Sequence, residues 1–282
     1  MNTETGILVR VSFGKFAPKV ANKKASHEYA HAHGADVAMH KAHMLLVSDE
    51  YTQPIQKFES SVRQNFLNVM TIPWERGGSS LLPAKMIDAF MNQVAGLRQE
   101  HDRLVAEWLS NYDAIVSAAK LKLNGDFDAR RYPSREDVSR KFYMEVTYSP
   151  LPASGDYRID VSKELLAEVA AETDRIADAR FADARLELRQ RLVDKLQHLS
   201  DRCKAVNEND KAKWYESNIT NLVDLIDIIP KMLLGNDVEL EQAIRDARSL
   251  LSGIDSDTIK SSEAVRDSVR KKAASIISSL QF

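Results

Sequence analysis

The stretch from Pro83 to Leu123 reads PAKMIDAFMNQVAGLRQEHDRLVAEWLSNYDAIVSAAKLKL. Its apolar side chains, together with His101, recur at steps of three and four residues from Ile87 onward. This spacing places them on one stripe of a helix. At a rise of ~1.5 Å per residue, a single helix over this stretch is about 60 Å long. Asn124-Gly125 is expected to end it.

A second and longer stripe runs from Leu166 to Val206 with the same spacing, and Ser162 stands where it can cap the first turn. The middle of this segment is rich in alanine, and Phe181 is its one large apolar side chain. Three further helices are predicted: one over 214–226 that breaks near Pro230 and stops at Gly235, one after Asn236 or Asp237 through Leu251, and one from about Asp257 to Leu280.

The remaining elements are short. Strands are predicted over 7–16 and 142–148, with a return strand at 157–159, and the segments 69–74 and 81–82 are two short strands or an ordered loop around Gly77-Gly78. Short helices are predicted from Ser26 to Gly34, from Ser48 or Asp49 through Phe66, and after Ser134, which forms a capping box with Asp137.

Two helices of this length indicate a mainly α protein, an elongated antiparallel helical bundle or coiled coil with a small β element. We divide the chain into a basic, histidine-rich segment 1–48, a segment 49–160 with the first long helix and the β element, a segment 161–252 with the second long helix and bundle helices, and a basic amphipathic helix 253–282. The last helix is expected to cover its own bundle, with a neighbouring subunit as the alternative.

Composition restricts the class of protein. The chain has 282 residues, 44% of them hydrophobic, and a net charge of −2, which excludes global disorder. Its one cysteine, Cys203, excludes an internal disulfide framework and suits a reducing compartment. No apolar run is long enough to span a bilayer, and the first residues lack the pattern of a signal peptide. We therefore predict a cytoplasmic protein without a membrane partner.

The small net charge hides two basic ends. Residues 1–45 carry six basic and three acidic side chains, and residues 258–282 carry five and two. Such segments serve nucleic acid, an acidic partner or a neighbouring subunit, or are ordinary solvated surface. The candidate contacts are Arg10, Lys15, Lys19, Lys23, Lys24, Lys41, Arg266, Arg270, Lys271 and Lys272.

Five of the seven histidines fall within residues 27–43, and His27-Glu28-Tyr29-Ala30-His31 matches the H-E-x-x-H pattern of zinc proteases. Val37 stands where the extended pattern requires a third ligand, and it cannot bind a metal. The surrounding residues are too polar to seat this helix in a core. A zinc hydrolase that uses His27, Glu28 and His31 is thus a remote alternative, and we predict no metal, no cofactor and no catalytic residue.

Other enzyme signatures are missing from the sequence: it contains neither a phosphate loop, nor a dinucleotide fingerprint, nor a nucleophile elbow. Cys203 and His101 occupy positions on helical stripes, where packing is the commoner role. The aromatic residues of the β segments form either a structural cap or a recognition surface, and for the latter the candidates are Trp74, Tyr143 and Tyr148.

Several short motifs resemble an uncharacterised family of tailed-phage and bacterial proteins. They are Asn22-Lys23-Lys24-Ala25-Ser26, Ala32-His33-Gly34-Ala35, Thr71-Ile72-Pro73-Trp74, Leu81-Leu82-Pro83, Trp108-Leu109-Ser110-Asn111-Tyr112, Phe127-Asp128-Ala129-Arg130-Arg131-Tyr132-Pro133-Ser134, Pro150-Leu151-Pro152 and Asp156-Tyr157-Arg158-Ile159. The resemblance covers about 7–235. It implies a phage-encoded protein of the host cytoplasm, from a genome region near replication genes or a MoxR-like ATPase, and no assigned reaction.

These observations predict a non-enzymatic protein that acts through its surfaces, either as a self-associating scaffold or as an adaptor for a protein partner, which includes an inhibitor of a host protein. The alternative is a DNA-binding accessory of phage DNA metabolism that uses the two basic ends.

Overall fold

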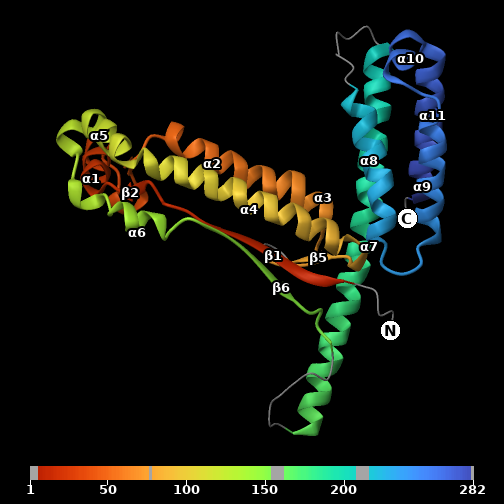
Figure 1. Ribbon diagram of the computed structural model, residues 1–282, viewed down its shortest axis with the longest axis horizontal. Coiled ribbons are helices and arrows are strands. Elements are labelled where there is room, and N and C mark those ends of the chain that lie inside the picture. Colours follow the sequence, from red (N-terminus) through yellow and green to blue (C-terminus); the bar gives the residue numbers. More distant parts are fainter. Residues whose placement is uncertain (1–5, 76–77, 154–161, 208–215, 281–282) are drawn as a thin grey trace. The chain divides into compact units, whose positions relative to one another are not determined.

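The computed structural model describes residues 6–75, 78–153, 162–207 and 216–280, and it is 71% helical with a small antiparallel sheet (Figure 1). The predicted class, mainly α with a small β element, is confirmed. The described residues form two compact units. Unit 1 combines those within Met1–Val9, Met70–Asp88 and Tyr148–Phe282, and unit 2 those within Arg10–Val69 and Ala89–Thr147.

The four segments proposed from the sequence follow the order of the chain, and the compact units do not. Four elements contribute residues to both units: β1 (Ile7–Gly14), α3 (Asn68–Met70), α4 (Ile87–Ser110) and β6 (Tyr143–Ser149). An element that crosses a unit boundary has no break in its sequence pattern. A division of the chain into consecutive segments therefore does not reveal the two units.

Unit 1 contains an antiparallel helical bundle. Its helices are α7 (Lys163–Asn207), α8 (Ser217–Met232), α9 (Val238–Leu251), α10 (Ser256–Ser261) and α11 (Glu263–Leu280). The helix α7 packs against α8 and α11, and α9 packs against the same two helices; the four long helices alternate in direction (Figure 1). Leu188, Leu192 and Leu196 of α7 are fully buried in this bundle. The C-terminal helix therefore covers its own bundle, as favoured from the sequence.

The ends of these helices follow local side-chain chemistry. Ser162 Oγ accepts a hydrogen bond from the Leu165 amide at 3.2 Å, and Asp237 Oδ1 accepts one from the Leu240 amide at 3.0 Å, so both predicted caps are confirmed. Pro230 lies in the last turn of α8, and the helix continues past it to Met232. The predicted single helix from about Asp257 is two helices, because the backbone leaves the helical region at Ser262.

The sheet has the strand order β4-β5-β1-β6, with β4 at Ile72–Pro73 and β5 at Ser80–Leu82. Ile7 of β1 lies opposite Leu82 of β5, and Ile72 of β4 lies opposite Leu81, both pairs antiparallel. The strands predicted on either side of the glycine turn are thus confirmed. The return strand predicted at 157–159, and Trp214, lie outside the described residues.

Unit 2 is built on α2 (Asp49–Ser61), α4 and α5 (Tyr112–Leu123). One of its cores includes Phe16, Trp108, Tyr112 and Ile115.

The single helix predicted from Pro83 to Leu123 is wrong. A 3-10 turn, η3 (Ala84–Met86), precedes α4, and Asn111 separates α4 from α5 with φ −95° and ψ 4°. The smaller elements are η1 (Val37–Met39), the π-helical turn η2 (Val62–Leu67), α3 (Asn68–Met70), η4 (Asn124–Asp126), η5 (Ala129–Arg131) and α6 (Arg135–Ser139), which Ser134 caps as predicted.

Near its N-terminus, unit 2 carries α1 (Lys23–Ala32) and a two-stranded sheet that the sequence analysis did not predict, of β2 (Lys19–Ala21) and β3 (His43–Leu45). The predicted cap of α1, Ser26, is wrong. Asn22 is the cap, since its side chain accepts a hydrogen bond from the Ala25 amide at 3.1 Å. Ser26 lies buried one turn further on and accepts a hydrogen bond from the Ala42 amide at 2.9 Å. The helix ends before Gly34, as predicted.

Candidate functional surfaces

The basic residues predicted near the N-terminus all lie exposed on unit 2: Arg10, Lys15, Lys19, Lys23, Lys24 and Lys41. Two of them make ion pairs. Lys15 Nζ lies 3.4 Å from Glu59 Oε2, and Lys24 Nζ lies 3.8 Å from Glu28 Oε1. Lys24 and Glu28 are both exposed, and an exposed pair of this kind contributes little free energy, so the Lys24 ammonium group stays available to a phosphate. The Glu59 side chain is only 7% exposed, so Lys15 neutralises a buried carboxylate and is less available.

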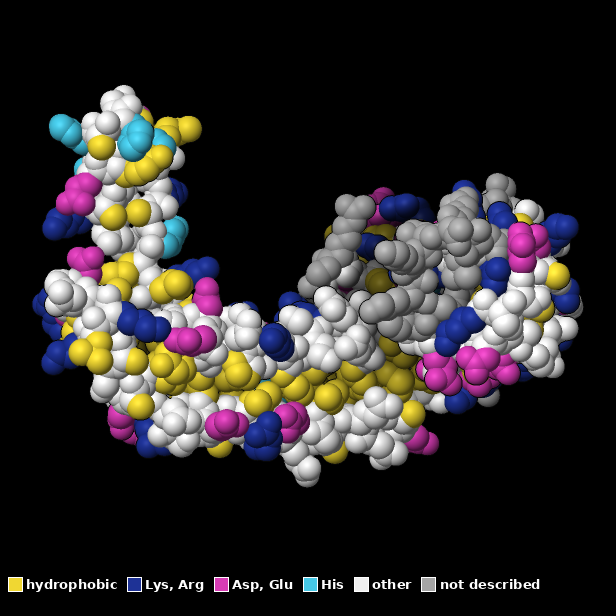
Figure 2. Space-filling view, turned by 90° about the horizontal axis from the view of Figure 1, so that it is seen from above, with side chains coloured by type: hydrophobic (Ala, Val, Ile, Leu, Met, Phe, Trp, Pro, Cys, Tyr) yellow, Lys and Arg dark blue, Asp and Glu magenta, His cyan; other side chains and the backbone are white. Residues whose placement is uncertain are grey.

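An exposed aromatic stack lies on the same segment. The Tyr29 ring stacks on His33 with 4.2 Å between centroids, and the His40 ring lies 5.0 Å from Tyr29 at a tilt of 55°. Tyr29 is 52% exposed, and Figure 2 shows the histidine side chains (cyan) gathered at one end of unit 2. The sequence analysis did not predict this stack, because the histidines were considered there only as metal ligands. Exposed rings on a segment that also carries lysines are a combination found in proteins that bind single-stranded nucleic acid.

The H-E-x-x-H residues lie on α1, as their spacing requires, and all three are exposed. Glu28 is the residue that pairs with Lys24. Across the described part of the chain, no group of three or more His, Cys, Asp or Glu side chains is arranged to hold a metal ion. Within the described residues, the geometry therefore offers His27 and His31 no third ligand for a zinc ion.

The basic residues predicted at the C-terminus do not form one surface. Lys271 and Lys272 are exposed, and Arg270 Nη1 pairs with Asp267 Oδ1 at 3.3 Å. Arg266 is only 8% exposed, and its Nη1 donates to the carbonyl oxygens of Ile259 and Lys260 at 2.7 and 3.0 Å. Its prediction as a binding residue is wrong, because the guanidinium is used to satisfy the C-terminal carbonyls of α10.

The nearby Cys203 is fully buried on α7, as its position in the stripe predicted. Burial raises the pKa of the thiol to about 11, and the positive charges of Arg266 and Arg270 only partly oppose this shift. A thiol with this pKa carries almost no thiolate near neutral pH, which agrees with a packing role.

The three aromatic residues predicted as a partner surface also include both exposed and buried side chains. Tyr143 and Tyr148 of β6 are 50% and 39% exposed. Trp74 is 4% exposed, and its ring packs edge-on against Phe181 of α7 with centroids 5.0 Å apart. The prediction that Trp74 belongs to a partner surface is therefore wrong. Trp74 has the structural role that the sequence analysis gave as the alternative for these aromatic residues.

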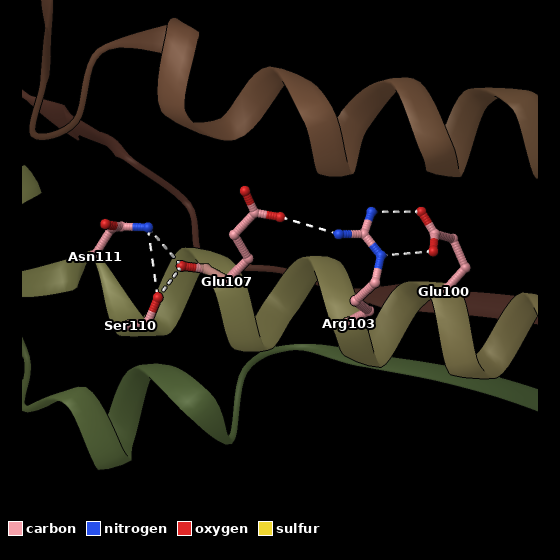
Figure 3. Close-up of polar contacts among 5 residues, drawn as sticks. All are labelled: Glu100, Arg103, Glu107, Ser110 and Asn111. Atoms are coloured by element: carbon pink, nitrogen blue, oxygen red, sulfur yellow. Dashed lines mark hydrogen bonds and ion pairs between the residues drawn. The ribbon is translucent and has the colours of Figure 1, made fainter.

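The interruption between α4 and α5 carries a polar cluster that the sequence analysis missed (Figure 3). Ser110 Oγ and Asn111 Nδ2 both donate to the Glu107 carbonyl, at 2.7 and 2.9 Å. Arg103 bridges Glu100 and Glu107, and its hydrogen bonds hold the pKa of Glu100 below the ordinary value. This cluster closes the end of α4 where a continuing helix would have supplied backbone donors.

A pocket of about 280 Å³ lies beside this interruption, with Tyr51, Ile55 and Trp108 in its wall and Glu50 and Glu107 among its lining residues. None of its lining residues is serine, cysteine or histidine. The pocket therefore lacks a serine or cysteine nucleophile with a histidine base, and it is a small, partly apolar recess with two carboxylates.

The first part of α7 exposes an apolar face. Leu165, Val169 and Ile176 are 47%, 37% and 46% exposed, and their spacing places them on one side of the helix. This part of α7 extends past α8, α9 and α11 of the same unit (Figure 1). Glu168 and Arg175, both exposed, follow one flank of the apolar face. Helical spacing alone did not reveal which side of this helix has no neighbour among the residues that the structure describes.

Comparisons with family models, curated proteins and solved structures give no match for the chain. The resemblance to a phage and bacterial family, and the predicted location in the cytoplasm, therefore stay predictions. Every helix within the described residues is too short or too polar to cross a bilayer.

Proposed function

We propose that the protein is a non-enzymatic helical scaffold that associates with a second copy of itself through the first part of α7. The observation that carries this proposal is the exposed row Leu165, Val169 and Ile176. Three large apolar side chains on one face of a helix are costly to leave in water, and a facing helix removes them from it.

The charges beside the row favour an antiparallel arrangement. Glu168 and Arg175 are seven residues apart and occupy the same flank. In an antiparallel pair, Glu168 of one copy faces Arg175 of the other while Val169 faces Ile176. In a parallel pair the two-fold axis runs along the helices and puts the same flank of the two copies on opposite sides of the interface, so Glu168 and Arg175 would not meet. Glu172, near the two-fold axis, is already paired with Arg175 of its own helix at 2.6 Å.

The expected affinity is modest. Removing a half-exposed apolar side chain from water contributes about 1 kcal/mol, and three such side chains come from each copy. We therefore expect a concentration-dependent monomer–dimer equilibrium.

Sedimentation equilibrium over a range of protein concentrations tests this proposal. The Val169→Glu/Ile176→Glu variant is expected to stay monomeric at concentrations where the unmodified protein dimerises. Leu121→Glu, at an 83% exposed leucine of unit 2, is the matched control and is expected to dimerise normally. Dimerisation that persists in the double variant contradicts the assignment to α7.

The orientation has its own test. Glu168→Arg and Arg175→Glu are each expected to weaken the dimer, because each places two like charges opposite one another. The two changes together restore opposite charges only in an antiparallel pair. If the combined variant is as weak as the single ones, the antiparallel arrangement is wrong.

One observation favours a second function, the binding of single-stranded nucleic acid. The stack of Tyr29, His33 and His40 lies on a segment that also exposes Lys23, Lys24 and Lys41. Binding of a labelled oligonucleotide, measured by anisotropy, is expected to weaken steeply with added salt. Tyr29→Ala is expected to weaken it further, and Lys271→Ala/Lys272→Ala to leave it unchanged. The absence of binding at low salt removes this function.

A further inference from the structure

Unit 1 holds a pocket of about 590 Å³ at the turn between α8 and α9, with η3 on its other side. It is separate from the apolar face of α7. Its volume falls within the range of sites that bind small molecules, about 300–1,000 Å³.

The charges of this pocket are strongly one-sided. Lys85, Lys231, Arg245 and Arg248 line it, and Glu241 is the one acidic lining residue. The chain as a whole has a net charge of −2, so this excess of positive charge is local. A concave surface with charges of one sign concentrates ligands of the opposite sign.

The two arginines are held by neighbours. Arg248 Nη2 donates to Asp227 Oδ1 at 2.7 Å, and Arg245 Nη2 donates to Gln242 Oε1 at 2.8 Å, with Glu241 Oε2 3.9 Å from its Nη1. Within the described residues, the exposed lysines Lys85 and Lys231 make no such pair. Two positioned guanidinium groups and two unpaired ammonium groups thus share one pocket.

Several backbone positions around the pocket are fixed by local structure. Pro83 and Pro230 fix their own φ angles, and the Met86 amide donates to the Pro83 carbonyl at 2.9 Å, which closes η3. Gly235 turns the chain with φ 82°, a conformation that favours glycine. Ile244, 4% exposed, contributes an apolar wall. Little ordering is therefore required before a ligand binds.

We propose that this pocket binds a small ligand with two or more phosphate groups. The phosphates would contact Lys85 and Lys231, and the guanidinium groups of Arg245 and Arg248 would add donors in a planar fork that suits phosphate oxygens. The apolar wall would receive the part of the ligand that carries the phosphates. A single carboxylate carries one negative charge and would neutralise only one of the two unpaired ammonium groups, Lys85 and Lys231.

Titration calorimetry with inorganic pyrophosphate and with ATP, both without added metal, tests the proposal on the full chain. Binding of both is expected, with ATP the tighter because it reaches the apolar wall. Lys85→Ala/Lys231→Ala is expected to weaken binding at least tenfold. Lys195→Ala/Lys271→Ala removes two exposed lysines from α7 and α11 of the same unit and is expected to change nothing.

Three outcomes overturn the proposal or part of it. If neither probe binds, or if both double variants weaken binding equally, the pocket is not a phosphate site. If an oligonucleotide binds through Lys85 and Lys231 while pyrophosphate does not, the ligand is a nucleic acid. If ATP binds no tighter than pyrophosphate, the role of the apolar wall is wrong. Unchanged circular dichroism of each variant confirms that the fold is retained.

Discussion

At the scale of single residues, Arg266 shows that a charged side chain in a basic segment can be part of the core. Its guanidinium satisfies two backbone carbonyls at the end of α10. We expect Arg266→Met, which keeps much of the aliphatic stem, to lower the free energy of unfolding by about 1–3 kcal/mol, because buried acceptors lose their donor. Chemical denaturation followed by circular dichroism measures this. Lys271→Met, at an exposed position, is expected to stay within about 0.5 kcal/mol; equal stability of the two variants would contradict the role of Arg266.

A second residue, Asp237, links stability to pH. Burial works to raise the pKa of this carboxyl, but hydrogen bonds from Arg189, at 2.7 and 2.9 Å, and from the Leu240 amide hold the pKa below its ordinary value of 3.8. The stability that the pair contributes is therefore complete above 3.8 and is lost as pH falls through that value toward the lowered pKa.

Asp237→Asn is expected to lower the free energy of unfolding by about 2–4 kcal/mol near pH 7, since Arg189 loses a buried partner. Denaturation at about pH 6 and at about pH 3 is expected to show a smaller difference in the variant than in the unmodified protein. Asp224→Asn, at an exposed carboxyl of α8, serves as the control. A pH dependence that is unchanged in Asp237→Asn would exclude the pair as its source.

At the scale of elements, periodicity predicted the long helices and the strands of the larger sheet but missed β2 and β3, and side-chain hydrogen bonds decided where several helices end. The apolar spacing continues from Trp108 through Tyr112 to Ile115, and all three are buried, so nothing in that spacing marks the interruption at Asn111. The interruption depends on bonds from Ser110 and Asn111 to one carbonyl. The sequence also did not predict the exposed apolar face of α7 or the contact of Tyr29 with His33 and His40. Both features depend on how segments pack in three dimensions.

The N-terminus of α1 gives an element-scale prediction, since Asn22 and Ser26 protect different amides. Asn22→Ala is expected to speed hydrogen exchange at Ala25, whose amide donates a hydrogen bond to the Asn22 side chain. Ser26→Ala is expected to speed exchange at Ala42 instead, because Ser26 Oγ joins α1 to the residue before β3. Loss of a helix cap costs about 1 kcal/mol, which is about a fivefold change in exchange rate. Faster exchange at Ala25 in Ser26→Ala, with Asn22→Ala unaffected, would restore Ser26 as the cap.

At the scale of the whole molecule, net charge by segment predicts less than the position of each charge. The basic residues of 1–45 are exposed on one unit, whereas the basic C-terminal segment uses Arg266 internally. Conversely, the residues between the two basic ends form the pocket with Lys85, Lys231, Arg245 and Arg248. Residues distant in sequence form that pocket, so the net charge of any one sequence segment does not reveal its positive charge.

The last prediction concerns the two units. Because β1, α4 and β6 each contribute residues to both, we expect one cooperative unfolding transition rather than two. Cys203 reports on unit 1: it is buried with a pKa of about 11, so a thiol reagent is expected to label it only after unfolding. Trp108 reports on unit 2, and Trp74→Phe/Trp214→Phe leaves it the sole tryptophan. The labelling and fluorescence midpoints in denaturant are expected to coincide. Labelling of Cys203 at a lower concentration than the loss of the Trp108 signal would show that unit 1 unfolds separately.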